Sequence, residues 1–386
     1  MGILKPRQPY SRSSQSMDPV QHRHIRGLHA RATPNHPLAR PRALSPVPDS
    51  EPLPRWISVA GLEFGVQSPG FCNDFPGKLG RNFFLNTRNT FERLSEAGFT
   101  TFRIPFRWER IQPTLGGPLD PDGVQHLRLQ MNLAQRVGGS VLFDLHNYGR
   151  YTRHVDGEPI ACGLDEEFDG QVLVGPDHLA DFWSRMAHAF SGQPGVIGYG
   201  LMNEPHDLPD KAWVRASRAA AAAIRGEGDK TRLYVAGERW SSSPHWDLVN
   251  PSSPWIEDPE NLVTYEAHCY LDQDGSGEYH KTFEEELEFD PGLCTRAVER
   301  LEPFLKWLED NNADGLLGEF AVPVDDHRWT ALLPPMLQAL DRAGVQTAWW
   351  AAGEHWGKYT LSLQPGRDPN RVPPAEVELL GAFDRD

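Results

Sequence analysis

The sequence predicts an α/β protein built as a (β/α)8 TIM barrel, and three observations support this prediction. Eight short apolar runs recur between residues 56 and 350. Each run is nearly continuous in its apolar character, which is typical of parallel strands covered on both faces. Helix-like stretches separate most of the runs, and the runs start about 41 residues apart, which leaves room for one strand, one helix and their loops.

The strands are expected at the apolar runs and the helices between them. The runs are residues 56–66, 100–106, 140–147, 196–204, 232–238, 262–268, 316–320 and 345–350. The helix-like stretches are residues 84–97, 121–137, 177–190, 210–226, 293–311 and 326–343. An open doubly wound sheet is the alternative, but it would usually carry a glycine-rich turn that binds phosphate, and the sequence has no such turn.

Single residues predict several helix ends. Asp120 and Asp177 stand near the starts of two helical stretches, where an aspartate side chain accepts hydrogen bonds from free backbone N–H groups. Gly98, Gly138 and Gly344 stand where helices should end, because glycine readily adopts the left-handed conformation found there.

Residues 1–55 differ in composition from the rest, and we expect them to form a disordered Pro/Arg/His-rich tail. They contain ten of the 34 prolines and four histidines, with few apolar residues in any periodic order. Such a segment cannot bury enough surface to offset the entropy that ordering would cost. The remaining residues, 56–386, are expected to form a single barrel domain.

The charge of the chain argues against two classes of partner. The formal net charge is −15, and because residues 1–55 hold nine Lys or Arg against three Asp or Glu, the rest carries −21. A domain this acidic repels nucleic acid and anionic membranes, so we expect neither as a partner. No stretch of the sequence reaches the roughly 18 apolar residues that a membrane span requires.

The cysteines and the first residues give weaker information. The four cysteines are far apart and form no CxxC pair, which argues against a local zinc site and leaves one or two disulfide bonds open: Cys72, Cys162, Cys269 and Cys294. The opening residues, MGILKPRQPYSRSSQS, are basic but are not followed by the apolar segment of a secretory signal peptide.

Polar residues stand at the ends of most runs, and a barrel of this kind places its reactive groups at the C-terminal ends of its strands. These residues are Arg103, His146, Asn147, Asn203, Glu204, Glu238, His268, Tyr270, Glu319, Trp349 and Trp350. Glu204 and Glu319 end the fourth and seventh runs, so we expect them to face each other across the barrel mouth. We assign no chemistry to Glu238.

Two facing carboxyl groups suit the cleavage of a glycosidic bond. One carboxyl must be protonated to donate to the leaving oxygen, and the other must be ionised to attack the anomeric carbon. For direct attack, the two carboxyl groups are expected to lie about 5–5.5 Å apart. A carboxylate beside Arg103 and the Tyr270 hydroxyl is expected to stay anionic, whereas a carboxyl in a drier place tends toward the neutral acid.

Six motifs occur along the chain in the order FRIPF, DLHNYGRY, LMNEPH, YEAHCYLDQDGSG, GEF and WWAAG. Together they resemble the retaining glycoside hydrolases of family 5, the cellulase family, from about residue 56 to the C-terminus. The segments LHNYGRY and HCYLDQDGSG look most like the endoglucanase branch that acts on β-1,4-glucan. The resemblance implies an O-glycosyl hydrolase of cellulose catabolism that needs no cofactor and no metal.

The resemblance also implies a role for each matching residue. Glu204 would be the acid/base and Glu319 the nucleophile of a double displacement, while Asn203 would hold the 2-hydroxyl of the reacting sugar. The other residues would bind substrate or hold the nucleophile: Arg103 and Tyr270 beside the nucleophile, His146 and His268 lining the −1 subsite, Asn147 next to His146, and Trp350 as the apolar floor. Two features depart from the family pattern, Cys269 and the long acidic stretch 153–175, so the shape of the cleft is not carried over.

The sequence leaves the exact substrate open. Mannan, xyloglucan and mixed-linkage glucan are alternatives to cellulose, as is an exo-acting β-glucosidase, because loops decide between them. Outside enzymes, the alternative is a non-catalytic carbohydrate-binding barrel. We expect a monomer whose partner is a β-glucan polysaccharide or oligosaccharide, and secretion is expected from the family resemblance although no signal peptide is visible.

The 12 tryptophans divide into two groups. Four at helical spacing are predicted to be core residues: Trp183, Trp213, Trp307 and Trp329. Four others stand in loops after strands, where an indole ring can stack on a sugar face: Trp108, Trp240, Trp246 and Trp356. Roughly half of this second group is expected to pack in the core instead.

Overall fold

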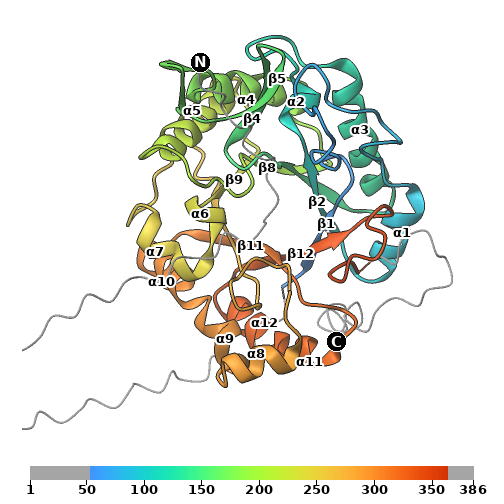
Figure 1. Ribbon diagram of the computed structural model, residues 1–386, viewed down its shortest axis with the longest axis vertical. Coiled ribbons are helices and arrows are strands. Elements are labelled where there is room, and N and C mark those ends of the chain that lie inside the picture. Colours follow the sequence, from blue (N-terminus) through green and yellow to red (C-terminus); the bar gives the residue numbers. More distant parts are fainter. Residues whose placement is uncertain (1–52, 364–386) are drawn as a thin grey trace, which may run out of the picture.

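The computed structural model describes residues 53–363, and at its centre lies a closed barrel of eight parallel strands (Figure 1). Strand β12 pairs with β1 and closes the barrel. The barrel strands are β1 (Arg55–Val59), β2 (Thr101–Phe106), β3 (Ser140–Leu145), β8 (Val196–Gly200), β9 (Arg232–Ala236), β10 (Val263–His268), β11 (Asp314–Phe320) and β12 (Gln346–Ala352). Each of the eight predicted runs overlaps one of these strands, so the predicted (β/α)8 barrel is confirmed.

Helices surround the barrel (Figure 1). The longer ones are α1 (Arg88–Glu96), α3 (Pro121–Arg136), α4 (Pro176–Phe190), α5 (Ala212–Gly226), α10 (Glu302–Asn311) and α12 (Leu333–Arg342). The shorter ones are α2 (Trp108–Ile111), α6 (Glu238–Ser241), α7 (Trp246–Val249), α8 (Phe283–Phe289), α9 (Leu293–Glu299), α11 (His327–Thr330) and a 3-10 turn (Ser243–His245). Within residues 53–363, no helix is both long enough and apolar enough to cross a membrane.

The predicted helix ends are mostly confirmed. The Asp120 side chain accepts a hydrogen bond from the Gly123 backbone N–H at the start of α3. Gly98, Gly138 and Gly344 follow the C-caps of α1, α3 and α12 with φ of 100°, 80° and 69°. The prediction for Asp177 is wrong: α4 begins at Pro176, so Asp177 lies inside the first turn, where its charge still favours the helix dipole.

Two predicted helices are each broken into two. Stretch 293–311 forms α9 and α10, and stretch 326–343 forms α11 and α12. Each second helix has proline in its first turn, Pro303 in α10 and Pro334 in α12. Proline has no N–H to donate to the preceding turn, and it fits best at a helix start, so each break falls just before it.

The stretch 153–175, which the family resemblance left open, lies mostly in two small antiparallel ribbons after the third barrel strand. Strands β4 (Arg150–Val155) and β5 (Glu158–Gly163) pair in one ribbon. Strands β6 (Glu167–Phe168) and β7 (Gln171–Val172) pair in the other. Both ribbons therefore lie between β3 and α4.

The described part of the chain begins at residue 53, within the predicted tail. Most of the predicted tail, residues 1–52, lies outside the described residues, as do residues 364–386 at the end of the predicted domain. The Leu53 backbone N–H donates to the Asp341 carboxylate on α12, and the Arg55 guanidinium pairs with the same carboxylate at 2.5 Å. Residues 53–55, which the sequence placed in the tail, are therefore fastened to the barrel.

The predicted core tryptophans are buried, which confirms that group: Trp183, Trp213, Trp307 and Trp329. The disulfide bonds that the sequence left open do not form, since all four cysteines of the chain are described and free: Cys72, Cys162, Cys269 and Cys294. The fold is thus held by a large apolar core around the barrel rather than by covalent links.

Candidate active site

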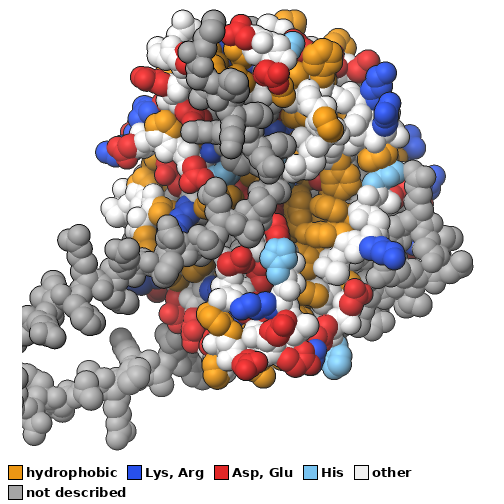
Figure 2. Space-filling model, viewed as in Figure 1, with side chains coloured by type: hydrophobic (Ala, Val, Ile, Leu, Met, Phe, Trp, Pro, Cys, Tyr) orange, Lys and Arg blue, Asp and Glu red, His pale blue; other side chains and the backbone are white. Residues whose placement is uncertain are grey.

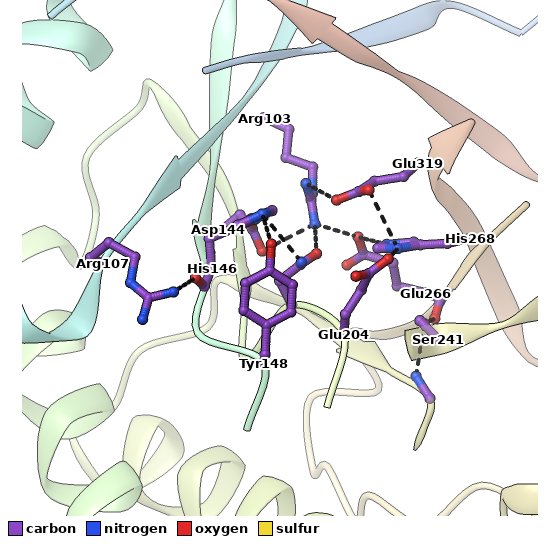
Figure 3. Close-up of polar contacts among 12 residues, drawn as sticks. Arg103, Arg107, Asp144, His146, Tyr148, Glu204, Ser241, Glu266, His268 and Glu319 are labelled. Atoms are coloured by element: carbon purple, nitrogen blue, oxygen red, sulfur yellow. Dashed lines mark hydrogen bonds and ion pairs between the residues drawn. The ribbon is translucent and has the colours of Figure 1, made fainter. Parts of the chain in front are cut away.

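The polar residues predicted at the strand ends mostly lie together at one end of the barrel (Figure 3). They come from different strands: Arg103 from β2, His146 just after β3, Asn203 and Glu204 just after β8, His268 from β10, Tyr270 just after it, Glu319 from β11 and Trp350 from β12. All barrel strands run parallel, so their C-terminal ends meet at the same mouth.

Glu204 and Glu319 are neighbours at the centre of this cluster. One carboxylate oxygen of each, together with one ring nitrogen of His268, lie within 4.8 Å of one another. Both acids are almost fully buried, with 1% of Glu204 and 3% of Glu319 exposed. Because a buried site has a lower effective dielectric constant than water, each neighbouring charge acts more strongly on these carboxyl groups than it would in solution.

Glu319 is held by a cation and a hydroxyl group. Arg103 Nη1 donates to its Oε1 at 3.2 Å, and the Tyr270 hydroxyl donates to its Oε2 at 2.8 Å. The contacts predicted for this carboxylate are therefore present. Burial would lower the pKa of Arg103, but the carboxylates of Asp144, Glu266 and Glu319 raise it above its ordinary value, so the guanidinium stays charged.

The position of Glu204 is set by a contact with a histidine and by the conformation of its own backbone. His268 Nδ1 lies 2.8 Å from its Oε1 (Figure 3). The residue has φ of 43°, a left-handed conformation that is uncommon for a side chain of this size and that concentrates at functional sites. The Asn203–Glu204–Pro205 segment thus turns sharply as it leaves β8, and the turn directs the carboxyl toward Glu319.

His268 carries a positive charge at neutral pH. Burial alone would lower its pKa, but Glu319, Glu204 and Glu266 raise the pKa to about 9. Its Nδ1 faces Glu204 and also lies 3.7 Å from Glu319, while its Nε2 lies 3.4 Å from Glu266 Oε1. An imidazolium donates from both ring nitrogens, so one ring serves several carboxylates.

His146 is neutral, in contrast. Burial lowers its pKa to about 3, despite nearby carboxylates. Its Nδ1 lies 2.8 Å from Asp144 Oδ2 and its Nε2 lies 3.0 Å from the Tyr148 hydroxyl, as expected for a neutral ring that donates at Nδ1 and accepts at Nε2. The ring stacks on Trp350 with centroids 5.0 Å apart and planes inclined by 6°.

Asn203 joins the two halves of the cluster. Its Oδ1 accepts from Arg103 Nη2 at 2.7 Å, and its Nδ2 lies 3.4 Å from His146 Nε2. Because Arg103 fixes the amide oxygen, the amide NH2 group is the part left to face the mouth.

Asn147 does not belong to this cluster. Its Oδ1 accepts from the Trp108 backbone N–H, and its Nδ2 donates to the Glu109 carboxylate and the Arg150 carbonyl. Both amide hydrogens are used and the residue is 1% exposed. The substrate-binding role predicted for Asn147 finds no support in these contacts, which fasten the start of β4 to α2.

Sequence reasoning missed three members of the site: Asp144, Tyr148 and Glu266. Asp144 and Glu266 each stand two residues before a site histidine on a strand, so their side chains lie on the same face as that histidine, deeper in the barrel. The repeated acid-x-His spacing was the available signal. Tyr148 stands two residues after His146, in a left-handed conformation that the sequence does not announce.

The loop tryptophans divide as expected. Trp108 and Trp246 are fully buried in the core. Trp240 is 37% exposed and stacks on His206. Trp356 is partly exposed, and the centroid of its ring lies 5.9 Å from that of Trp350. A hollow lined by hydrophobic side chains is visible near the middle of the face shown in Figure 2.

Among the described residues, the groups close enough to share a metal ion are Glu204, His268 and Glu319. A protonated histidine has no free lone pair, and His268 is held protonated by the surrounding carboxylates. We therefore assign no metal to these residues. The arrangement is instead that of two carboxyl groups with different partners, one suited to attack and one suited to proton transfer.

The model of the family Cellulase (glycosyl hydrolase family 5) matches residues 60–355, which is most of the chain. The chain belongs to glycosyl hydrolase family 5. This membership confirms the resemblance of the sequence motifs. Among curated members of the family, the chain is 30% identical over 324 residues to "Probable endo-beta-1,4-glucanase B" of Aspergillus oryzae, covering 82% of this chain and 86% of that protein.

Solved structures of family 5 enzymes share the fold. Pseudomonas stutzeri endoglucanase Cel5A in complex with cellobiose has a TM-score of 0.73 at 33% identity, covering 88% of this chain and 96% of that chain. XacCel5A in complex with cellopentaose has a TM-score of 0.72 at 29% identity, covering 85% of this chain and 98% of that chain.

Proposed function

We propose that this chain is a retaining endo-β-1,4-glucanase in which Glu319 is the nucleophile and Glu204 the acid/base. The observation that carries the proposal is the approach of the two carboxyl groups to within 4.8 Å between oxygens. A retaining enzyme needs this short separation, because its nucleophile must reach the sugar directly. An inverting enzyme needs roughly 6.5–9.5 Å, because a water molecule stands between the base carboxylate and the sugar.

In the first step, a Glu319 oxygen attacks the anomeric carbon as the glycosidic C–O bond breaks. Glu204 gives its proton to the departing oxygen, which leaves as the hydroxyl group of the shortened glucan. The products are a glycosyl ester on Glu319 and an ionised Glu204. The ion pair with Arg103 and the hydrogen bond from Tyr270 hold the Glu319 carboxylate in place before attack.

In the second step, the ionised Glu204 removes a proton from a water molecule that attacks the same carbon. The ester bond to Glu319 breaks, and the sugar leaves with the configuration it had in the substrate. Glu204 is then protonated again and Glu319 ionised, so the starting state is restored. The imidazolium of His268 next to Glu204 stabilises the charge that this residue carries between the two steps.

The remaining site residues would bind the reacting sugar. The NH2 group of Asn203 is oriented by Arg103 and would donate to the sugar 2-hydroxyl. His146 and Trp350 form a stacked pair that would give the −1 subsite one wall and its apolar floor. Both reacting groups come from one chain and from the protein itself, so a monomer without cofactor or metal would suffice.

The choice of β-1,4-glucan rests on the names of the relatives. Relatives in fungi are named endo-beta-1,4-glucanases, and the similar P. stutzeri and XacCel5A structures contain cellobiose and cellopentaose. A domain of net charge −21 is compatible with an uncharged polymer, which it does not repel.

Reducing-sugar release from carboxymethylcellulose tests the proposal. The wild-type protein should release sugar, and Glu319→Ala should abolish release while the protein remains folded by circular dichroism. Glu238→Gln is the matched control, because Glu238 also stands just after a barrel strand and lies outside the cluster. Release by Glu319→Ala at the wild-type rate would refute the assignment, and binding to insoluble cellulose without release by the wild type would favour a binding barrel.

A further inference from the structure

Glu266 is a buried carboxylate beneath the site for which the proposed reaction has no direct use. It lies on β10 and is 2% exposed. Its Oε1 faces two cations, Arg103 Nη2 at 3.1 Å and His268 Nε2 at 3.4 Å (Figure 3). A buried carboxylate is costly unless it is paired, so two cationic partners indicate a specific arrangement.

The glycine before Glu319 makes room for this carboxylate. A Cβ atom at Gly318 would come within 1.9 Å of Glu266 Oε1, far inside van der Waals contact. The backbone of Gly318 is not left-handed, so the space rather than the conformation requires glycine. The strand that carries the nucleophile is thus shaped around Glu266.

We propose that Glu266 is a positioning residue for the acid/base: it accepts from His268 Nε2, keeps the ring doubly protonated, and so holds His268 Nδ1–H on Glu204. This inference rests on the role proposed above for Glu204. Glu266 touches neither the sugar nor a reacting atom and acts through the ring between it and Glu204.

The charges around His268 support this role. The ring faces Glu204, Glu266 and Glu319, and the pKa of His268 is raised to about 9 although burial opposes this. Arg103 lies behind Glu266 and Glu319 and pairs with both, as it does with Asp144 on β3. Of the three carboxylates around the ring, Glu266 is the one that does not change its charge or bonding during the proposed reaction.

Replacing Glu266 by glutamine removes this fixed charge while keeping the size of the side chain. The amide oxygen can still accept from Nε2, but the ring loses a neighbouring anion and deprotonates more easily. A neutral ring carries one proton, on Nε2 or on Nδ1, and whenever it is on Nε2 the hydrogen bond to Glu204 is lost. Glu204 is then free to rotate away from the leaving oxygen.

The test is a titration of His268 by NMR of protein labelled with 15N in its histidine rings, together with kinetics on cellotetraose. In the wild type, His268 should stay protonated up to about pH 9. In Glu266→Gln, the titration should move down by about one pH unit or more. Above the lowered pKa, the variant should lose up to about tenfold in kcat for each pH unit of the shift, with KM changed far less, so the pH profile of kcat should fall at a lower pH than in the wild type.

Two further variants separate positioning from a structural role. Glu266→Asp keeps the charge and should restore most of the His268 titration. Glu286→Gln is the matched control, because Glu286 is 1% exposed and pairs with Arg296 at 2.7 Å outside the catalytic cluster. It should lower stability without changing the His268 titration or the pH profile.

The proposal is overturned if His268 titrates alike in the wild type and Glu266→Gln, or if the titration falls while kcat and its pH profile stay as in the wild type. Should Glu266→Gln fail to fold, Glu266→Asp and the wild-type titration decide, and a wild-type His268 that is neutral at pH 7 overturns the proposal. Absence of glucan hydrolysis by the wild type would instead refute the proposed function, because the titration does not depend on turnover.

Discussion

Two regions of the barrel mouth are built alike and yet hold histidines in opposite states. His146 follows β3 and has Asp144 two residues before it, while His268 ends β10 and has Glu266 two residues before it. Each histidine contacts its own acid through one ring nitrogen. His146 is nevertheless neutral and His268 charged.

The second ring nitrogen explains the difference. For His146 it meets the Tyr148 hydroxyl and the Asn203 amide, which carry no charge to balance the buried ring. For His268 it meets the carboxylates of Glu204 and Glu319. Burial opposes the charge in both places. It prevails at His146, where Arg103 and Arg107 also lower the pKa, whereas the carboxylates in contact with His268 outweigh it there.

The largest effect is expected from replacing Glu204, the acid in contact with the charged His268. Glu204→Ala should lower kcat/KM on cellotetraose by about 10²–10⁴-fold, the usual contribution of a positioned proton donor. On 2,4-dinitrophenyl β-cellobioside the glycosylation step should be nearly unaffected, because that leaving group departs without a proton. The measurement is the initial burst of dinitrophenol, and an equally large loss in the burst would contradict the assignment.

A smaller effect is expected in the way the contribution of His268 to protein stability depends on pH. The pKa of His268 is raised to about 9 in the folded protein, above the unfolded value near 6.5. Its stabilising contribution is therefore complete below about pH 6.5 and disappears as the pH rises through 9. Relative to His268→Gln, the wild type should lose on the order of 2 kcal/mol across this window in urea unfolding.

No change in that difference between pH 6 and pH 10 would show that His268 is not held charged. His146→Gln is the matched control on the neutral side. Because the pKa of His146 is lowered to about 3, its difference from the wild type should stay constant above about pH 7.5, where this histidine is neutral in both the folded and the unfolded protein.

In the region around the neutral His146, the residue whose contribution to stability depends on pH should be Asp144 rather than the histidine. Burial raises the pKa of Asp144 to about 7, although Arg103 opposes this, whereas Arg103 and His268 lower the pKa of Glu266 despite its burial. The contribution of Asp144 to stability is thus complete below about pH 4 and is lost as the pH rises through 7.

Relative to Asp144→Asn, the wild type should become less stable between pH 4 and pH 8 by roughly 4 kcal/mol at most. Urea unfolding at several pH values measures this difference. A wild type that gains stability over Asp144→Asn across that range would contradict the raised pKa.

The smallest effect is expected from removing the Tyr148 hydroxyl, which contacts His146. Tyr148→Phe removes a hydrogen bond of 3.0 Å to Nε2 and should cost about 1 kcal/mol of unfolding free energy. The cost should not depend on pH between 5 and 8, because His146 stays neutral in the folded protein over that range. A cost that grows with falling pH would indicate that His146 is charged after all.

The sequence predicted the barrel strands and most of the site residues that stand at their ends. The near-continuous apolar runs located all eight barrel strands, and this placed Arg103, Glu204 and Glu319 at one mouth because parallel strands end together. The family resemblance supplied the pairing of Tyr270 with Glu319, which the contacts match.

The sequence could not predict what depends on packing in three dimensions. Asp144 and Glu266 stand inside apolar runs, and their charges make sense only once Arg103 is known to lie between them. Asn147 was grouped with the site because it follows His146, yet its amide points to α2. The left-handed turn at Glu204 lies at a residue that rarely adopts it, so no local signal announces it.

The most direct test of the account is the configuration of the first product of hydrolysis. Oxygens of Glu204 and Glu319 lie within 4.8 Å, which leaves no place for a water molecule to attack in a single displacement. Proton NMR of cellotetraose during its first minutes with the enzyme should show new reducing ends in the β configuration, before mutarotation. Reducing ends that appear first as the α anomer would contradict the account.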